Sequence, residues 1–134
     1  MGRRTRWWPW GLLALSVLLA GCKLKRVEDE KSVMLSANIS GEVMEIQSQP
    51  KDMQITVTAT SSDGPVTLYL VPLTDANEVM NDLDHKEDSP KVIAKSNTGE
   101  TATLEGTAPA NKDYSVIGYS DKETQVKAKI VGRY

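Results

Sequence analysis

Hydrophobic and polar residues alternate along most of the chain after residue 32, and this two-residue period is the feature that most restricts the fold. In residues 54–60, for example, Ile55, Val57 and Ala59 alternate with glutamine and threonine. Such alternation is typical of β-strands with one buried face. The same pattern, less regular in places, predicts strands at residues 33–39, 43–47, 66–71, 91–95, 101–105, 114–119 and 125–131.

Turn-forming residues separate these runs. Ser-Asp-Gly-Pro at 62–65, Asn-Thr-Gly at 97–99 and Asn-Lys-Asp at 111–113 each lie between two predicted strands, and Gly64 can adopt a positive φ. The prolines after residue 49 all fall at run boundaries, where a missing N–H group breaks no ladder hydrogen bond. Seven to eight strands at this spacing predict an all-β fold, a single antiparallel, jelly-roll-like β-sandwich.

One segment departs from the strand pattern. In residues 74–85, Ala76, Val79, Met80 and Leu83 recur at helical spacing. Thr74 could cap a helix whose first turn is acidic. We therefore predict a short helical or loop insertion in the sandwich.

The start of the chain has the three parts of a secretory signal. Arg3, Arg4 and Arg6 precede a short apolar run at 11–20, and small residues follow before Cys22, the only cysteine. The apolar run is shorter than the roughly 20 residues that a membrane-spanning helix needs. Leu19-Ala20-Gly21-Cys22 resembles the lipobox of bacterial lipoproteins, which implies cleavage between Gly21 and Cys22 and lipidation of Cys22. An ordinary secretory signal with Cys22 as a bystander is the alternative.

The resemblance to lipoproteins implies a location in the cell envelope, with palmitate or similar acyl chains holding the protein on a membrane. Two or more acyl chains anchor a protein stably, whereas one gives reversible binding. Lys23, rather than aspartate, follows the cysteine. By analogy with lipoproteins of bacteria with two membranes, this residue favours the periplasmic face of the outer membrane. In an envelope with one membrane, the anchor would lie in the cell membrane.

The rest of the chain divides into a linker and one domain. We expect residues 1–21 to be the signal peptide, 22–31 a lipidated N-terminus and charged tether, and 32–134 the β-sandwich. The charged stretch 23–31 has no sustained period, and its nine residues could reach about 30 Å. Removal of residues 1–21 takes away three basic and no acidic residues, which changes the net charge from −2 to −5. This acidic balance argues against nucleic-acid binding.

A family resemblance also extends across roughly residues 41–131. The strand at 66–71, the turn Lys95-Ser-Asn-Thr-Gly99, and Ala108-Pro109 before Tyr114-Ser115-Val116 are similar in order and spacing to bacterial pre-peptidase C-terminal domains. These domains are small jelly-roll-like β-sandwiches attached to secreted proteases and other exported proteins. The resemblance implies a binding or accessory role and supplies no catalytic residue. Asp113 stands where that family usually has glycine.

The sequence contains no recognisable catalytic constellation. His85 is the only histidine and lies in a polar run, so a solvated loop histidine is the expected reading. Because zinc sites commonly combine several histidine and cysteine side chains, and this chain has one of each, we expect no zinc site. We also expect no cofactor. Six acidic residues lie between positions 75 and 88, among them Asp82, Asp84 and Asp88, which are candidate calcium ligands. A solvated acidic surface is the preferred interpretation, since the ligand spacing of an EF-hand is not present.

These observations predict a membrane-anchored, non-enzymatic envelope lipoprotein whose β-sandwich binds another envelope protein or supports an assembly. The membrane, through the N-terminal lipid, and an envelope protein are the expected partners. The alternative is a calcium- or small-ligand-binding module that uses the acidic segment at 75–88. A hydrolase with an unusual site is a third hypothesis, and the lone histidine counts against it.

Overall fold

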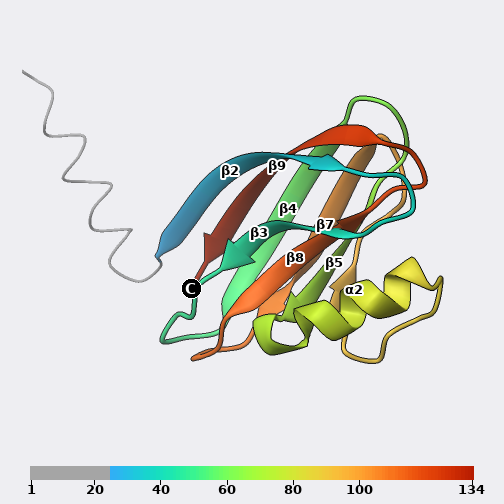
Figure 1. Ribbon diagram of the computed structural model, residues 1–134. Helices are drawn as coiled ribbons and strands as arrows, with labels where there is room; N and C mark the ends of the chain where they lie inside the picture. The colour runs from blue at the N-terminus through green and yellow to red at the C-terminus, as the bar shows by residue number, and fades with distance from the viewer. Residues whose placement is uncertain (1–24) are drawn as a thin grey trace, which may run out of the picture.

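The computed structural model describes residues 25–134 as eight β-strands in two antiparallel four-stranded sheets, with one short helix outside them (Figure 1). One sheet has the strand order β2-β9-β4-β7, and the other has the order β3-β8-β5-β6. The prediction of an all-β sandwich with seven to eight strands and one short insertion is therefore confirmed. No helix in this part of the chain is long and apolar enough to span a membrane.

The strands pair as though one long hairpin had been folded over on itself. β2 pairs with β9, β3 with β8, β4 with β7 and β5 with β6, all antiparallel. Folding of this hairpin brings β4 next to β9 and β5 next to β8, which completes the two sheets. This is the topology of a jelly roll.

The strand bounds follow the predicted runs closely at most positions. The strands are β2 (Arg26–Leu35), β3 (Gly41–Ile46), β4 (Met53–Ser61), β5 (Thr67–Pro72), β6 (Ala94–Lys95), β7 (Thr101–Ala108), β8 (Tyr114–Tyr119) and β9 (Thr124–Arg133). β6 is shorter than the predicted run at 91–95. Ile39 belongs to the loop after β2, because that strand ends at Leu35, and its side chain is 55 % exposed.

The hydrophobic core lies between the sheets and is built from the alternating residues. In β4, Ile55, Val57 and Ala59 are buried, whereas their polar neighbours face outward. Leu104 on β7 and Ile130 on β9 are the register partners of Val57 and complete the inner face at that level. Burial of apolar surface stabilises such a core by roughly 25 cal/mol per Å².

The prediction of a tether at residues 22–31 is wrong for residues 26–31. Residues 26–31, the second part of the predicted tether at 22–31, form the first half of β2 and pair with β9 as far as Arg26–Arg133. Lys25 and Tyr134 extend this pairing with two backbone hydrogen bonds of 2.6 and 3.0 Å. β2 is an edge strand, so its charged side chains can reach water from either face. That explains why the hydrophobic alternation is lost there.

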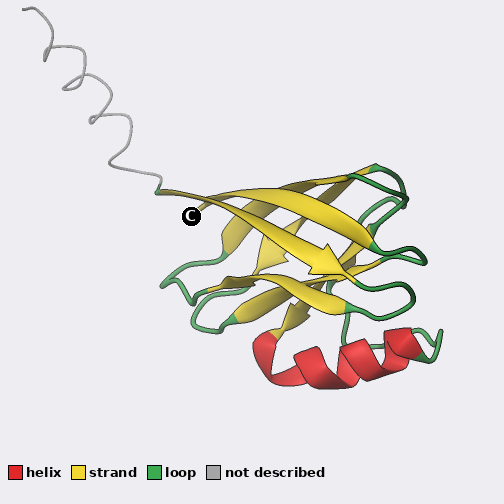
Figure 2. Ribbon diagram, turned by 45° about the horizontal axis from the view of Figure 1, so that its top comes forward, coloured by secondary structure: helices red, strands yellow, loops and turns green. Residues whose placement is uncertain are grey.

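The helical insertion is confirmed, but its start differs from the prediction. A 3-10 turn (η1, Leu73–Asp75) leads into α2 (Ala76–Asp84), and Asp75 rather than Thr74 occupies the N-cap position. Val79 is fully buried in a second, smaller cluster together with Val71 and Ile117, which lie on the outer face of the β3-β8-β5-β6 sheet. Figure 2 shows the helix lying along the outside of the sandwich.

Candidate functional site

Gly21 and Cys22, the predicted cleavage and lipidation positions, lie outside the described residues. Lipidation of Cys22 therefore stays a prediction. The described chain begins at Lys25, three residues later, and its backbone already pairs there with Tyr134 at the end of the chain. Three residues span at most about 10 Å when extended, so a lipid on Cys22 would hold the domain close to a membrane surface.

The acidic segment is fastened to the rest of the domain at its C-terminal end by Asp84. Oδ1 of this aspartate accepts hydrogen bonds from the backbone N–H of Ser40 at 2.7 Å and from its hydroxyl at 2.8 Å. Ser40 is buried and lies in the loop between β2 and β3. Asp84 therefore joins the last turn of α2 to that loop and has a structural role without any metal.

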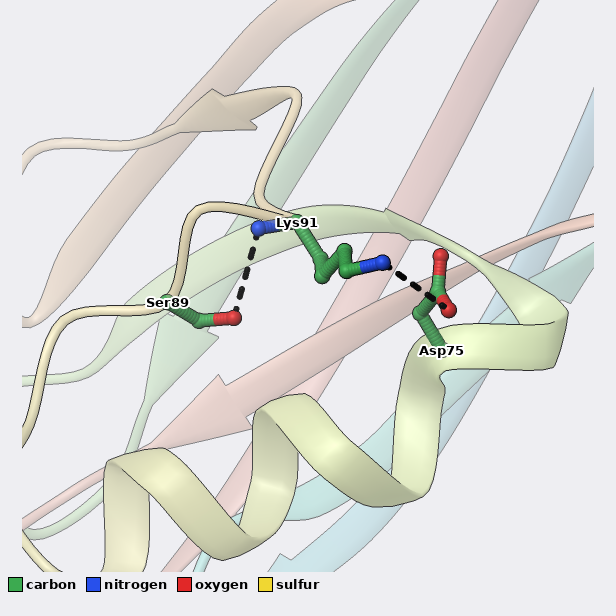
Figure 3. Close-up of polar contacts among 3 residues, drawn as sticks. All are labelled: Asp75, Ser89 and Lys91. Carbon is green, nitrogen blue, oxygen red and sulfur yellow. Dashed lines mark hydrogen bonds and ion pairs between the residues drawn. The ribbon is translucent and has the colours of Figure 1, made fainter.

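A second connection lies at the start of the segment. Lys91 Nζ lies 4.0 Å from Asp75 Oδ1, and the backbone N–H of Lys91 donates to Ser89 Oγ at 3.3 Å (Figure 3). These contacts join the residues before α2 to the loop that follows it. The ion pair is partly exposed, and such pairs contribute little to stability.

The calcium candidates are not brought together. Among residues 25–134, no group of three or more acidic, histidine or cysteine side chains has an arrangement that could hold a metal ion. Asp82, Asp84 and Asp88 therefore do not form a shared site in the described structure. His85 is exposed, and its Nδ1 lies 2.8 Å from the carbonyl oxygen of Asn81, as expected for a histidine that satisfies the end of a helix.

The turn that ends α2 is a Schellman motif with lysine where glycine is usual. Lys86 has a φ of 60°. Its N–H bonds to the carbonyl of Leu83 at 2.9 Å, and the N–H of Glu87 bonds to that of Asp82 at 2.8 Å. A left-handed conformation costs a non-glycine residue roughly 1 kcal/mol. Holding the backbone of Lys86 in this left-handed conformation therefore costs the folded state some free energy.

The main surface hollow near this segment is a groove with tyrosine walls, here called the α2 groove. Two adjoining hollows of about 260 and 160 Å³ share Tyr69, Leu83 and Asp88, and Tyr119 lines the larger one. Tyr119 is the register partner of Thr67, two residues from Tyr69. The two tyrosines are therefore diagonal neighbours on the outer face of the sheet, at a separation that aromatic side chains can bridge.

Polar groups surround the α2 groove. The Tyr119 hydroxyl donates to Asn38 Oδ1 at 3.1 Å, and Lys86 Nζ donates to the same oxygen at 3.3 Å. Lys95 Nζ lies 5.7 Å from the centre of the Tyr69 ring, within the range of a cation–π contact. Burial, followed by the nearby charges of Asp88 and Tyr119, raises the pKa of Tyr69 above its usual 10.0.

Sequence reasoning identified the acidic side of this groove and missed the tyrosines. Their meeting depends on the register between β5 and β8, two strands more than forty residues apart in the chain. The alternation in each strand does show that Tyr69 lies on the opposite face from Leu68 and Leu70. It contains no information on which strand lies beside it.

Comparisons with known proteins assign the chain to no family. No protein-family model matches the chain, and no match is found among curated proteins. A solved structure of the disulfide-linked pili that form Bacillus endospore appendages has a TM-score of 0.43 and 11 % identity, over 83 % of this chain and 88 % of that chain. The capsid of cyanophage Pam1 gives a TM-score of 0.44 and 12 % identity, over 82 % and 85 %.

A pre-peptidase C-terminal domain is also among the matching structures. That domain, from the collagenase of Bacillus anthracis, has a TM-score of 0.43 and 9 % identity, over 79 % of this chain and 87 % of that chain. The β-sandwich implied by the resemblance is present in the two four-stranded sheets of this chain. Similarity at this level does not assign the chain to that family.

Proposed function

We propose that this protein is a lipid-anchored, non-enzymatic binding module of the bacterial cell envelope. The observation that carries the proposal is the short separation in sequence between the lipobox-like stretch and the first strand of the β-sandwich. β2 begins at Arg26, four residues after Cys22, and immediately joins the sheet. A lipid on Cys22 would leave a spacer of two residues, Lys23 and Leu24, between the anchor and Lys25, so the domain would act close to the membrane.

The arrangement of polar groups supports binding rather than catalysis. The only histidine is at a helix end, and Asp75 and Asp84 of the acidic segment make structural contacts. The threonine side chains of β4 and β7 alternate with core residues, as expected for the outward face of a sheet. A jelly roll of this kind offers edges, faces and end loops for recognition.

Subcellular fractionation tests this proposal. The full chain, expressed in a bacterium with two membranes, should appear in the membrane fraction and be released by detergent but not by high salt. The Cys22→Ser variant should move to the soluble fraction or stay as an unprocessed precursor. Equal release of both chains by salt alone would contradict lipid anchoring, and Lys31→Ser serves as a control that changes a nearby charge without changing Cys22.

A second candidate function is the binding of a small ligand in the α2 groove, which the pairing of Tyr69 and Tyr119 favours. A ligand with an apolar face and several hydroxyl groups, such as a sugar, matches aromatic walls and a rim of lysine, asparagine and acid. Titration with N-acetylglucosamine, followed by NMR, should shift the Tyr69 and Tyr119 signals and spare Tyr134. Uniform or absent shifts would contradict this second function.

A further inference from the structure

The free backbone edge of β2 extends over ten residues. Lys25 and Tyr134 form a mutually hydrogen-bonded pair, so the antiparallel ladder alternates from there, and residues 27, 29, 31, 33 and 35 bond to β9. The backbone groups of Arg26, Glu28, Glu30, Ser32 and Met34 therefore face away from the sheet. Only the N–H of Glu30 has a local acceptor, Asp29 Oδ1 at 2.8 Å.

The other sheet edges in the described structure are better protected. On β7, Asn97 acts as a substitute strand, since its Nδ2 donates to the carbonyl of Thr101 at 3.0 Å and its Oδ1 accepts from the N–H of Thr103 at 2.9 Å. β6 has only two residues. β3 has six residues and a register shift between Glu42 and Met44, and such irregularities discourage pairing. β2 is thus the longest edge with open backbone groups.

A cleft lies beside this edge. β2 and β3 are joined at one end by the 36–40 loop, and each is the edge strand of its own sheet (Figure 1). Toward the other end they enclose a cleft of about 440 Å³, here called the β2–β3 cleft. Val27, Ile46, Met53 and Ile130 are its apolar lining residues, the last three of them almost fully buried. Its charged lining residues are Glu28, Asp29, Lys31 and Glu45.

We propose that the β2 edge and the β2–β3 cleft bind an extended protein segment in which apolar and basic residues alternate. A strand added to β2 would bond to the free groups of Glu28 and Ser32, as in other cases of β-strand addition. Its inward side chains would enter the cleft over Ile130 and Met53. Its outward side chains would lie beside Glu28, whose carboxylate already pairs with Arg26 at 2.9 Å, and beside Glu30, where lysine or arginine is favoured.

The charged residues that line the cleft favour a basic partner. Three of the four charged residues that line the cleft are acidic. This inference rests on the proposed binding role, for which it specifies the binding surface and the chemistry of the partner. It does not depend on lipid attachment.

Calorimetric titration of the detergent-solubilised full chain with model peptides tests this inference. The probe is an acetylated nine-residue peptide that alternates lysine and valine, compared with a peptide of the same composition in which the five lysines precede the four valines. The alternating peptide should bind saturably, and the block peptide should bind at least about tenfold more weakly because it cannot present one apolar face. Equal affinity for both peptides would overturn the proposal.

Paired variants test the site itself. Ser32→Pro removes an N–H from the free edge of β2, and Thr107→Pro is the matched change on the free edge of β7. Peptide affinity should fall at least about tenfold for Ser32→Pro only. The double variant Glu28→Lys and Glu30→Lys should weaken binding by a similar factor, whereas Glu105→Lys, on the outer face of the same sheet, should not.

Hydrogen exchange gives a readout that does not depend on a proline variant folding. Peptide binding should slow exchange of the Glu28 and Ser32 amides and leave those of Glu105 and Thr107 unchanged. Absence of saturable binding, or protection at β7 instead of β2, would overturn the inference. Membrane release of the Cys22→Ser variant would still support the proposed anchoring in that case, so failure of the two proposals can be told apart.

Discussion

At the scale of single residues, Lys86 has a left-handed backbone conformation that is unfavourable for a residue with a side chain. Its φ of 60° lies at the C′ position of a Schellman motif. We expect Lys86→Gly to raise the free energy of unfolding by about 0.5–1 kcal/mol, because glycine adopts this conformation without a steric penalty. Lys86→Ala is the control and should give no increase. Urea denaturation measures both, and equal stabilisation by alanine would contradict the assignment.

A second residue-scale prediction concerns Tyr114, which is buried at the start of β8. Burial, and to a smaller extent the charge of Asp52, raises the pKa of Tyr114 above 10.0. The unfolded chain therefore releases this proton at a lower pH than the folded chain. The stability that this difference contributes is complete below pH 10 and is lost as pH rises toward the folded pKa.

Tyr114→Phe removes this titration. The variant should lose less stability than the wild type between pH 9 and pH 11, as measured by thermal melts. Tyr134→Phe, at the end of the chain, is the control. A pH dependence for Tyr114→Phe that matches the wild type would contradict the assigned cause.

At the scale of elements, the attachment of α2 depends on Asp84. Two hydrogen bonds from Ser40 to this carboxylate connect the helix to the β2–β3 loop. Asp84→Ala should lower the free energy of unfolding by about 1–3 kcal/mol, the usual effect when buried donors lose a charged acceptor. Asp82→Ala, the same change on the same helix, should alter it by less than about 0.5 kcal/mol.

Thermal melts separate this structural role of Asp84 from calcium binding. Thermal melts of the wild type with excess calcium and with chelator should coincide, because the described acidic residues form no group suited to a metal. A rise of several degrees with calcium that is lost in Asp82→Asn plus Asp84→Asn would contradict the structural reading.

At the scale of the whole molecule, the strands and their buried faces could be predicted because each depends on a local two-residue period. The pairing of β2 with β9, or of β5 with β8, joins segments far apart in the chain and leaves no local signal. The first half of β2 was missed because an edge strand tolerates Asp29 and Lys31 on its inward side. The tyrosine groove was missed because it depends on register between strands.

Truncation tests where the domain begins. A chain that starts at Lys25 should unfold cooperatively, whereas one that starts at Ser32, the boundary expected from the sequence, lacks six residues of β2 and uncovers part of β9. We expect the shorter chain to melt at least about 10 °C lower, a shift that about 2 kcal/mol gives in a domain of this size. Equal melting temperatures would show that residues 25–31 are a linker after all.

The proposed role in the cell envelope depends on Cys22 as the point where this sandwich is anchored. Labelling with radioactive palmitate, followed by electrophoresis of the full chain, tests it most directly, since Cys22 is the only cysteine. The wild type and a Lys23→Ser control should incorporate label and migrate at the processed size. Cys22→Ser should incorporate none and remain as the larger precursor. Undiminished labelling of Cys22→Ser, or an unlabelled wild type of processed size, would contradict the account.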